Sequence, residues 1–184
     1  LVDEVYGPYT AEDDADGAFG GVTAVGLPNT VVTGSFTKFH GLGGLKIGWL
    51  VADEPFVGRA REVSMHVPAV AEPSRALARR FFANRDELVA DSRSHLRRNH
   101  GLLSSFVEGR DDLDGGIAAG CTFGFVEHER ADGDELAAAG WDAGVLVVPG
   151  RFFDMPSGIR LSAGRSTAEV DAGLDRFGEV LDGL

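Results

Sequence analysis

Short apolar segments typical of strands alternate with segments of helical periodicity along most of the chain. Val, Thr and aromatic runs predict strands at about 30–33, 45–52, 122–127, 145–148 and 159–162. Apolar residues at helical spacing predict helices at about 54–63, 74–83, 86–108, 134–143 and 167–182. Alternation of this kind is typical of an α/β fold.

The longest predicted helix divides the pattern in two. We expect one part over residues 1–84, and a second over residues 85–184 that contains the helix and a compact α+β portion. Residues 7–21 carry Gly, Pro and Asp without periodicity, which predicts a loop. The chain opens on Leu1-Val2, which resembles the end of a buried strand, so we expect it to be the C-terminal part of a longer protein.

The charge of the chain limits its partners. The formal net charge is −12, from 29 acidic and 17 basic residues, and only Lys38 and Lys46 are lysines. Dispersed carboxylates with so little lysine indicate a cytoplasmic protein of a halophile, because salt screens their repulsion; the alternative is an acidic mesophile protein. The charge argues against nucleic acid as a partner.

No apolar run approaches the roughly 20 residues of a membrane-spanning helix, and the histidines lack the spacing of a metal site.

The segment Gly34–Trp49 holds both lysines in a glycine-rich stretch between two predicted strands. It is not a dinucleotide fingerprint, because it leads into a strand rather than a helix. Ser35, Lys38 and Lys46 together suit an anionic phosphate and an electrophilic carbonyl. A lysine amine condenses with an aldehyde to give a Schiff base when its neighbours lower its pKa.

Three further residues fit the same chemistry. Asp3 and Tyr6 close an earlier strand, where a carboxylate can keep a pyridine nitrogen protonated and a phenol can bond a ring oxygen. Arg160 lies on a predicted strand, and a guanidinium pairs bidentately with a carboxylate. The alternative is that Asp3 and Tyr6 are ordinary loop residues and that Arg160 forms a structural ion pair.

These motifs, in this order, resemble the class I and II aminotransferases, the fold-type I enzymes that use pyridoxal phosphate (PLP). The resemblance rests on Asp3-x-x-Tyr6, on Ser35-x-x-Lys38 with Lys46 eight residues further on, and on Arg160 within Ile-Arg-Leu-Ser. It covers nearly the whole chain, but only about the second half of a family member. It implies the end of the large PLP domain, with a mixed and mainly parallel sheet, then a long helix and a small α+β domain.

The resemblance also implies a role for each residue. Lys38 carries the cofactor as a Schiff base and shuttles the proton. Asp3 keeps the pyridinium protonated and Tyr6 bonds the phenolic oxygen. Ser35 and Lys46 hold the phosphate, and Arg160 binds the substrate carboxylate. The implied reaction moves an amino group from an α-amino acid to a 2-oxo acid, in a homodimer.

Two departures from the family pattern and two alternatives remain. The phosphate cation is usually arginine, whereas this chain has Lys46, and His40 stands where an aliphatic, aromatic or amide residue is expected; we interpret His40 as a loop residue without a role. Another fold-type I reaction is open: a histidinol-phosphate aminotransferase, a carbon–sulfur lyase or a decarboxylase. The second alternative is that the chain is an inactive fragment that serves as a binding or dimerisation module.

Overall fold

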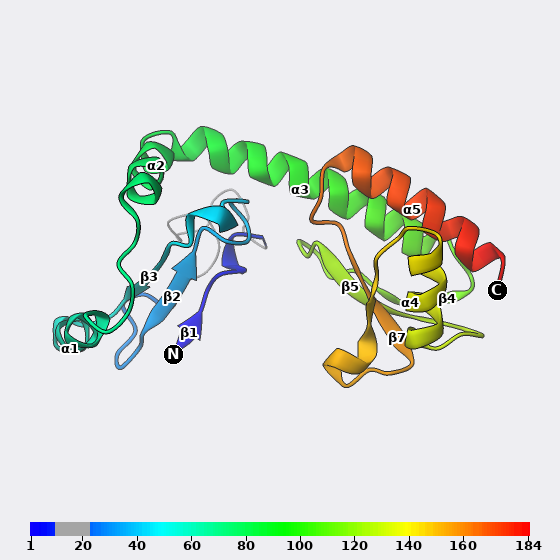
Figure 1. Ribbon diagram of the computed structural model, residues 1–184, viewed down its shortest axis with the longest axis horizontal. Helices are drawn as coiled ribbons and strands as arrows, with labels where there is room; N and C mark the ends of the chain where they lie inside the picture. Colours follow the sequence, from blue (N-terminus) through cyan, green and yellow to red (C-terminus); the bar gives the residue numbers. More distant parts are fainter. Residues whose placement is uncertain (10–22) are drawn as a thin grey trace. The chain divides into compact units, whose positions relative to one another are not determined.

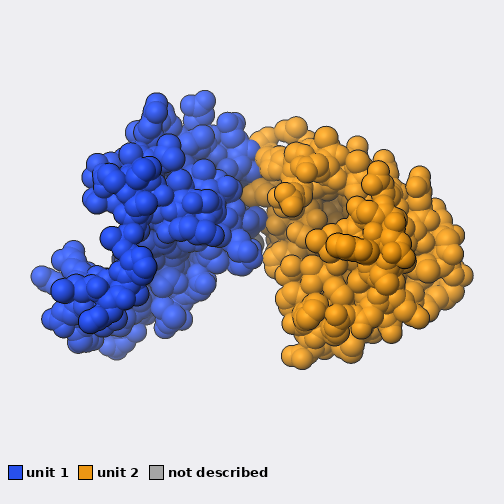
Figure 2. Space-filling view, viewed as in Figure 1, with its two compact units in different colours: residues 1–93 blue, residues 94–184 orange. Residues whose placement is uncertain are grey.

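The computed structural model of the chain describes residues 1–9 and 23–184. The chain divides into two compact units, residues 1–93 and residues 94–184, coloured separately in Figure 2. Most of the loop expected over residues 7–21 lies outside the described residues, and residues 7–9 form a single 3-10 turn, η1 (Gly7–Tyr9).

The first unit contains a mixed three-stranded sheet. Its strands stand in the order β1-β2-β3, with β1 parallel to β2 and β3 antiparallel to β2. The strands are β1 (Val2–Asp3), β2 (Val32–Ser35) and β3 (Gly48–Val51). The second strand lies two residues later than the apolar pattern predicted, because β2 continues through Gly34 and Ser35 to pair with β3. The third strand lies within its predicted range but is shorter.

Three helices follow the sheet in sequence, close to the positions predicted: α1 (Glu54–Ser64), α2 (Glu72–Ala83) and α3 (Arg85–Glu108). The Asp53 carboxylate caps α1 by accepting the backbone N–H of Phe56 at 2.8 Å. Asn84 separates α2 from α3, the break that the sequence indicated. Helix α3 begins in the first unit and ends in the second.

The second unit contains a four-stranded antiparallel sheet in the order β4-β5-β7-β6. Its strands are β4 (Leu113–Gly116), β5 (Phe123–His128), β6 (Val148–Pro149) and β7 (Gly158–Ser162). The pattern did not predict β4, since Leu-Asp-Gly-Gly has little intrinsic strand preference and forms a strand through its pairing with β5. The strand expected over 145–148 is wrong for all but its last residue.

Helices cover one face of this sheet. Helix α4 (Gly133–Asp142) and α5 (Thr167–Asp182) each begin at a capping box, formed by Asp132 with Glu135 and by Ser166 with Glu169. In Figure 1, α5 runs alongside the second half of α3. Apolar residues of the three helices meet alternate residues of β5 and β7 in one core: Leu103, Val107, Val126, Leu136, Ile159, Leu161, Val170, Phe177 and Leu181. Phe123, Phe125 and Arg160 therefore belong to the opposite face.

No helix in the described ranges, 1–9 and 23–184, is long and apolar enough to cross a membrane.

Candidate active site

One edge of the first sheet gathers most of the predicted site residues. Asp3 ends β1 opposite Thr33, and Ser35 ends β2 opposite Gly48, the first residue of β3. Because β1 and β2 are parallel and β3 runs the other way, the ends of the first two strands and the start of the third share this edge. The segment with Lys38 leaves β2 there, and Lys46 enters β3 there.

Lys38 lies in a turn directly after β2. The Ser35 hydroxyl accepts the backbone N–H of Thr37 at 3.2 Å, and the Gly41 N–H donates to the Lys38 carbonyl at 3.0 Å. The Lys38 side chain is exposed, and its Nζ lies 5.8 Å from the centre of the Tyr6 ring. The fold thus places the predicted amine beside the predicted phenol, although 32 residues separate them in the sequence.

Lys46 adopts a backbone conformation that is unusual for a lysine. It follows the 3-10 turn η2 (Gly43–Leu45) in the left-handed region, with φ 53° and ψ 42°. Non-glycine residues in this region are strained by about 1 kcal/mol or more, and such residues concentrate at binding sites. The side chain is exposed, so its ammonium is available to an anion at the sheet edge.

Buried aromatic side chains pack beside the turn that contains Lys38. Phe36 is 1% exposed, and its ring packs edge-on against Trp49, Phe81 and His40. His40 is itself buried, which corrects our interpretation of it as a loop residue without a role. Burial lowers the pKa of His40 to about 4, so its ring is neutral at pH 7 and packs as an aromatic side chain. The sequence indicated the loop but not that its histidine folds inward.

Sequence reasoning missed Tyr9. Its ring lies 5.5 Å from the ring centre of Tyr6 and 5.6 Å from that of Phe39. Burial, with a smaller contribution from Tyr6, raises the pKa of Tyr9 to about 12. Tyr9 thus remains a neutral phenol whose ring lies beside that of Tyr6. The only sequence signal was a second tyrosine three residues after the first.

Arg160 lies in the second unit, in the middle of β7. It stands opposite Phe125 of β5 and Val148 of β6. The guanidinium carbon lies 4.7 Å from the ring centre of Phe153 and 5.8 Å from that of Phe123. Its Nε is buried and has no hydrogen-bond partner among the described residues. A buried donor without a partner is costly, so this atom is suited to bind a ligand.

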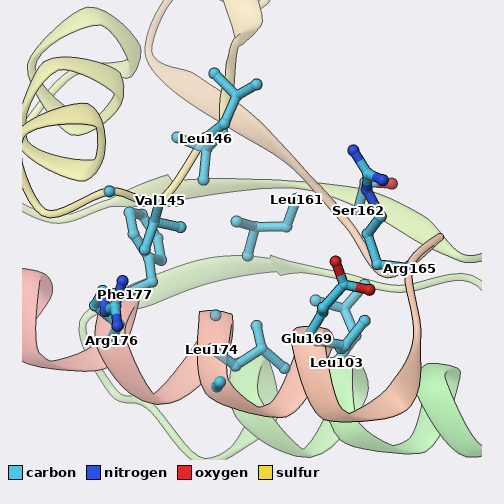
Figure 3. A pocket seen from close by; sticks show the side chains of 15 residues that line it. Leu103, Val145, Leu146, Leu161, Ser162, Arg165, Glu169, Leu174, Arg176 and Phe177 are labelled. Atoms are coloured by element: carbon cyan, nitrogen blue, oxygen red, sulfur yellow. The ribbon is translucent and has the colours of Figure 1, made fainter.

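A pocket of about 380 Å³ in the second unit lies on the other face of the sheet (Figure 3). Leu161 and Phe177 line it, with Arg165 and Glu169 among its charged residues. Leu161 follows Arg160 on β7, and successive strand residues point to opposite faces. Arg160 itself is not among the residues that line the pocket.

Residues 1–177 match the family described as aminotransferase class I and II. The chain belongs to that family. The aromatic amino acid aminotransferase of Rhodococcus jostii is 33% identical over 93% of this chain and 44% of its own length. Histidinol-phosphate aminotransferase 3 of Rhizobium meliloti is 30% identical over 98% of this chain and 47% of its own. The chain thus spans less than half the length of these curated relatives.

A solved structure of the family shows the same fold. The crystal structure of a putative aminotransferase from Silicibacter pomeroyi is 25% identical, with a TM-score of 0.82 over 99% of this chain and 50% of that one. The α/β aminotransferase fold expected from the sequence is confirmed.

The family and the fold imply PLP as the cofactor. The residues at the sheet edge fit this group in their chemistry. Lys38 offers an exposed amine for its aldehyde, and Asp3 offers a carboxylate for its pyridine nitrogen. Ser35 and Lys46 offer a hydroxyl and an ammonium for its phosphate, and Tyr6 a phenol for its ring oxygen.

Proposed function

We propose that this chain provides the catalytic lysine and the carboxylate-binding arginine of a PLP-dependent aminotransferase, which moves an amino group from an α-amino acid to a 2-oxo acid. The observation that carries the proposal is the meeting of β1, β2 and β3 at one edge, with Lys38 5.8 Å from the Tyr6 ring. PLP supplies the electron sink when it is bound. Residues 1–84 would belong to the cofactor domain, and residues 85–184 would form the linking helix and the small domain.

Each residue of the first unit would act on a different part of the cofactor. Lys38 would bind the aldehyde covalently and later carry the proton, because its amine is exposed in a turn. Asp3 would hold a proton on the pyridine nitrogen, and Tyr6 would donate to the ring oxygen. Ser35 and Lys46 would bind the phosphate. Lysine in place of arginine keeps the charge but loses the bidentate fork.

Arg160 would bind the substrate carboxylate. Phe153 and Phe123 lie near the guanidinium, so its N–H edge is the part left for an anion. Phe153 also lies beside this carboxylate site, where an aromatic substrate would contact it. With the named activity of the Rhodococcus relative, this favours an aromatic amino acid as donor. The working state would be a homodimer in the cytoplasm of a halophile.

The test uses the full-length gene product in concentrated salt, as wild type and as Lys38→Ala and Lys38→Arg. After unbound PLP is removed by desalting, we expect a visible absorbance band that stays with the wild-type protein alone and is lost on addition of an amino acid. Borohydride reduction followed by mass spectrometry should locate a pyridoxyl group on the peptide that contains Lys38. Lys38→Arg is the matched control, since it keeps the charge but cannot form the covalent bond. A pyridoxyl group fixed by borohydride in either variant would overturn the assignment of Lys38.

A substrate panel separates the reactions that share this fold. L-Phenylalanine, L-tyrosine, L-aspartate and histidinol phosphate would each be supplied with 2-oxoglutarate, and all products identified. We expect glutamate and the aromatic 2-oxo acid from the first two. Histidinol phosphate carries a phosphate ester in place of the carboxylate, so preference for it would support the alternative shown by the Rhizobium relative. Release of CO₂ or sulfide, from L-aspartate or added L-cysteine, would contradict amino transfer.

A further inference from the structure

Asn99 is a polar side chain buried entirely within the second unit. It lies on α3 with 0% of its surface exposed. Its Nδ2 donates to the carbonyls of Ala163 at 2.9 Å and Arg165 at 2.8 Å, and its Oδ1 accepts the Thr167 hydroxyl at 2.8 Å. Both amide N–H groups and the amide oxygen are therefore used.

His95 supports the same contact from one turn earlier on α3. Residues four apart share a helix face, and the His95 Nε2 lies 3.0 Å from the Arg165 carbonyl oxygen. A carbonyl only accepts, so Nε2 carries the proton in this bond. Two side chains of α3 thus converge on the segment between β7 and α5.

The segment that they hold continues directly from the strand of Arg160. Ala163 follows the last residue of β7, and Thr167 begins α5. The Ala163 N–H donates to the Thr122 carbonyl at 2.7 Å. After Ala163 the segment leaves the sheet. The Ala163 and Arg165 carbonyls accept hydrogen bonds from the Asn99 amide rather than from another strand. The amide therefore fixes the end of β7 to α3 at defined atoms.

An apolar residue at position 99 would fill this space without specifying a register. A buried amide costs free energy unless all of its groups are bonded, whereas an apolar core tolerates small shifts. The amide bonds to two fixed carbonyls, so α3 and β7 meet in one alignment only. Helix α3 is also the segment by which the chain passes from the unit of Lys38 to the unit of Arg160.

We propose that Asn99, assisted by His95, is a positioning residue that fixes strand β7, and with it Arg160, to helix α3. This inference rests on the proposed function, because it assumes that Arg160 binds the substrate carboxylate. Loss of the amide should then weaken carboxylate binding and leave the chemistry at Lys38 nearly unchanged.

The test compares Asn99→Leu with wild type in the full-length gene product. Leucine keeps the branched four-atom skeleton of the asparagine side chain but makes no hydrogen bond. We expect the KM for L-phenylalanine and the Ki of the unreactive carboxylate 3-phenylpropanoate to rise about tenfold, with kcat within twofold. Backbone hydrogen exchange over residues 163–169 should become faster. Thr167→Val loses only the hydrogen bond from the Thr167 hydroxyl to Asn99, so KM and Ki should rise by a smaller factor. This variant replaces Asn99→Leu in the test if Asn99→Leu does not fold.

A double-mutant cycle separates positioning from general stability. In an Arg160→Ala background, Asn99→Leu should change the Ki less than twofold, because the group that it positions is gone. Asn84→Leu is the matched control: Asn84 is exposed, its Nδ2 donates to the Arg80 carbonyl at 2.8 Å, and its loss should leave the Ki unchanged.

Two failures are distinguishable. A full-length protein without aminotransferase activity would overturn the proposed function and this inference with it. An active protein in which Arg160→Ala raises the Ki, while Asn99→Leu leaves it unchanged or lowers only kcat, would overturn the inference alone.

Discussion

The guanidinium carbon of Arg160 lies 4.7 Å from the ring centre of Phe153. The two residues come from different elements, since Arg160 is on β7 and Phe153 ends the 3-10 turn η3 (Gly150–Phe153). The Phe153 ring also packs edge-on against the Phe125 ring, with 5.1 Å between the two ring centres, and this contact orients the plane of the Phe153 ring. A cation over a fixed aromatic face keeps its N–H groups free at the edge, where a carboxylate binds in the plane.

Replacing Phe153 by leucine should weaken substrate binding through Arg160. A cation–π contact contributes about 0.5–2 kcal/mol, which corresponds to a rise in KM of about two- to thirtyfold. Steady-state kinetics with L-phenylalanine measure this change in KM. Phe152→Leu is the control, because the Phe152 ring is 66% exposed and stacks on Arg151 instead. Equal effects of the two substitutions would show that the contact does not orient Arg160.

Gly34→Ala should destabilise the first unit. A Cβ at position 34 would lie 2.8 Å from atoms of the Trp49 ring, closer than real side-chain contacts allow. Overpacking of this kind costs about 1–3 kcal/mol, so we expect a lower midpoint in urea unfolding. Gly44→Ala is the control, since a Cβ there would meet nothing within 4 Å. Equal midpoints for the two variants would contradict the close packing of Trp49 on β2.

His40 should make the stability of the fold depend on pH below neutrality. Its pKa falls to about 4 in the folded state through burial, against about 6.5 in the unfolded chain. Above pH 6.5 both states are neutral and the stability is complete. Between pH 6.5 and 4 only the unfolded state binds the proton, so stability falls as the pH falls, by up to about 3 kcal/mol.

The measurement is urea unfolding at pH 7 and pH 5 for wild type, His40→Leu and His66→Leu. We expect His40→Leu to lose less stability than wild type between the two pH values, because the titrating group is gone. His66 is exposed in the segment between α1 and α2, and its substitution should leave the wild-type difference in place. An unchanged difference in His40→Leu would show that this ring is not buried.

Much of the secondary structure followed from local sequence signals. The five helices lie within two residues of the predicted bounds, because caps such as Asp53 and Ser166 and apolar spacing act within a few residues. Strand bounds were less accurate. β4 was missed and the strand expected over 145–148 was misplaced, because a strand exists only through pairing with another strand, and the pattern within one segment does not show that pairing.

Some residues of the candidate site were also indicated by the sequence, and others were not. The motifs with Asp3, Lys38 and Arg160, in that order, carried the resemblance that implied PLP, and the family confirms this cofactor. The roles of these three residues stay predictions. The contacts of Tyr9, Phe153 and Asn99 left no such signal. Each of these residues acts through partners from other elements, and an isolated tyrosine, phenylalanine or asparagine has many other uses.

By itself the sequence determined the helices, the acidic surface charge and the set of reactive groups, because each depends on residue type and short-range spacing. The tertiary structure alone decided that Asp3, Ser35 and Lys46 share one sheet edge, since this follows from the directions in which three strands pair. It also decided that His40 and Asn99 are buried while Lys38 remains exposed. Burial depends on what packs over a side chain, and those atoms belong to residues distant in the sequence.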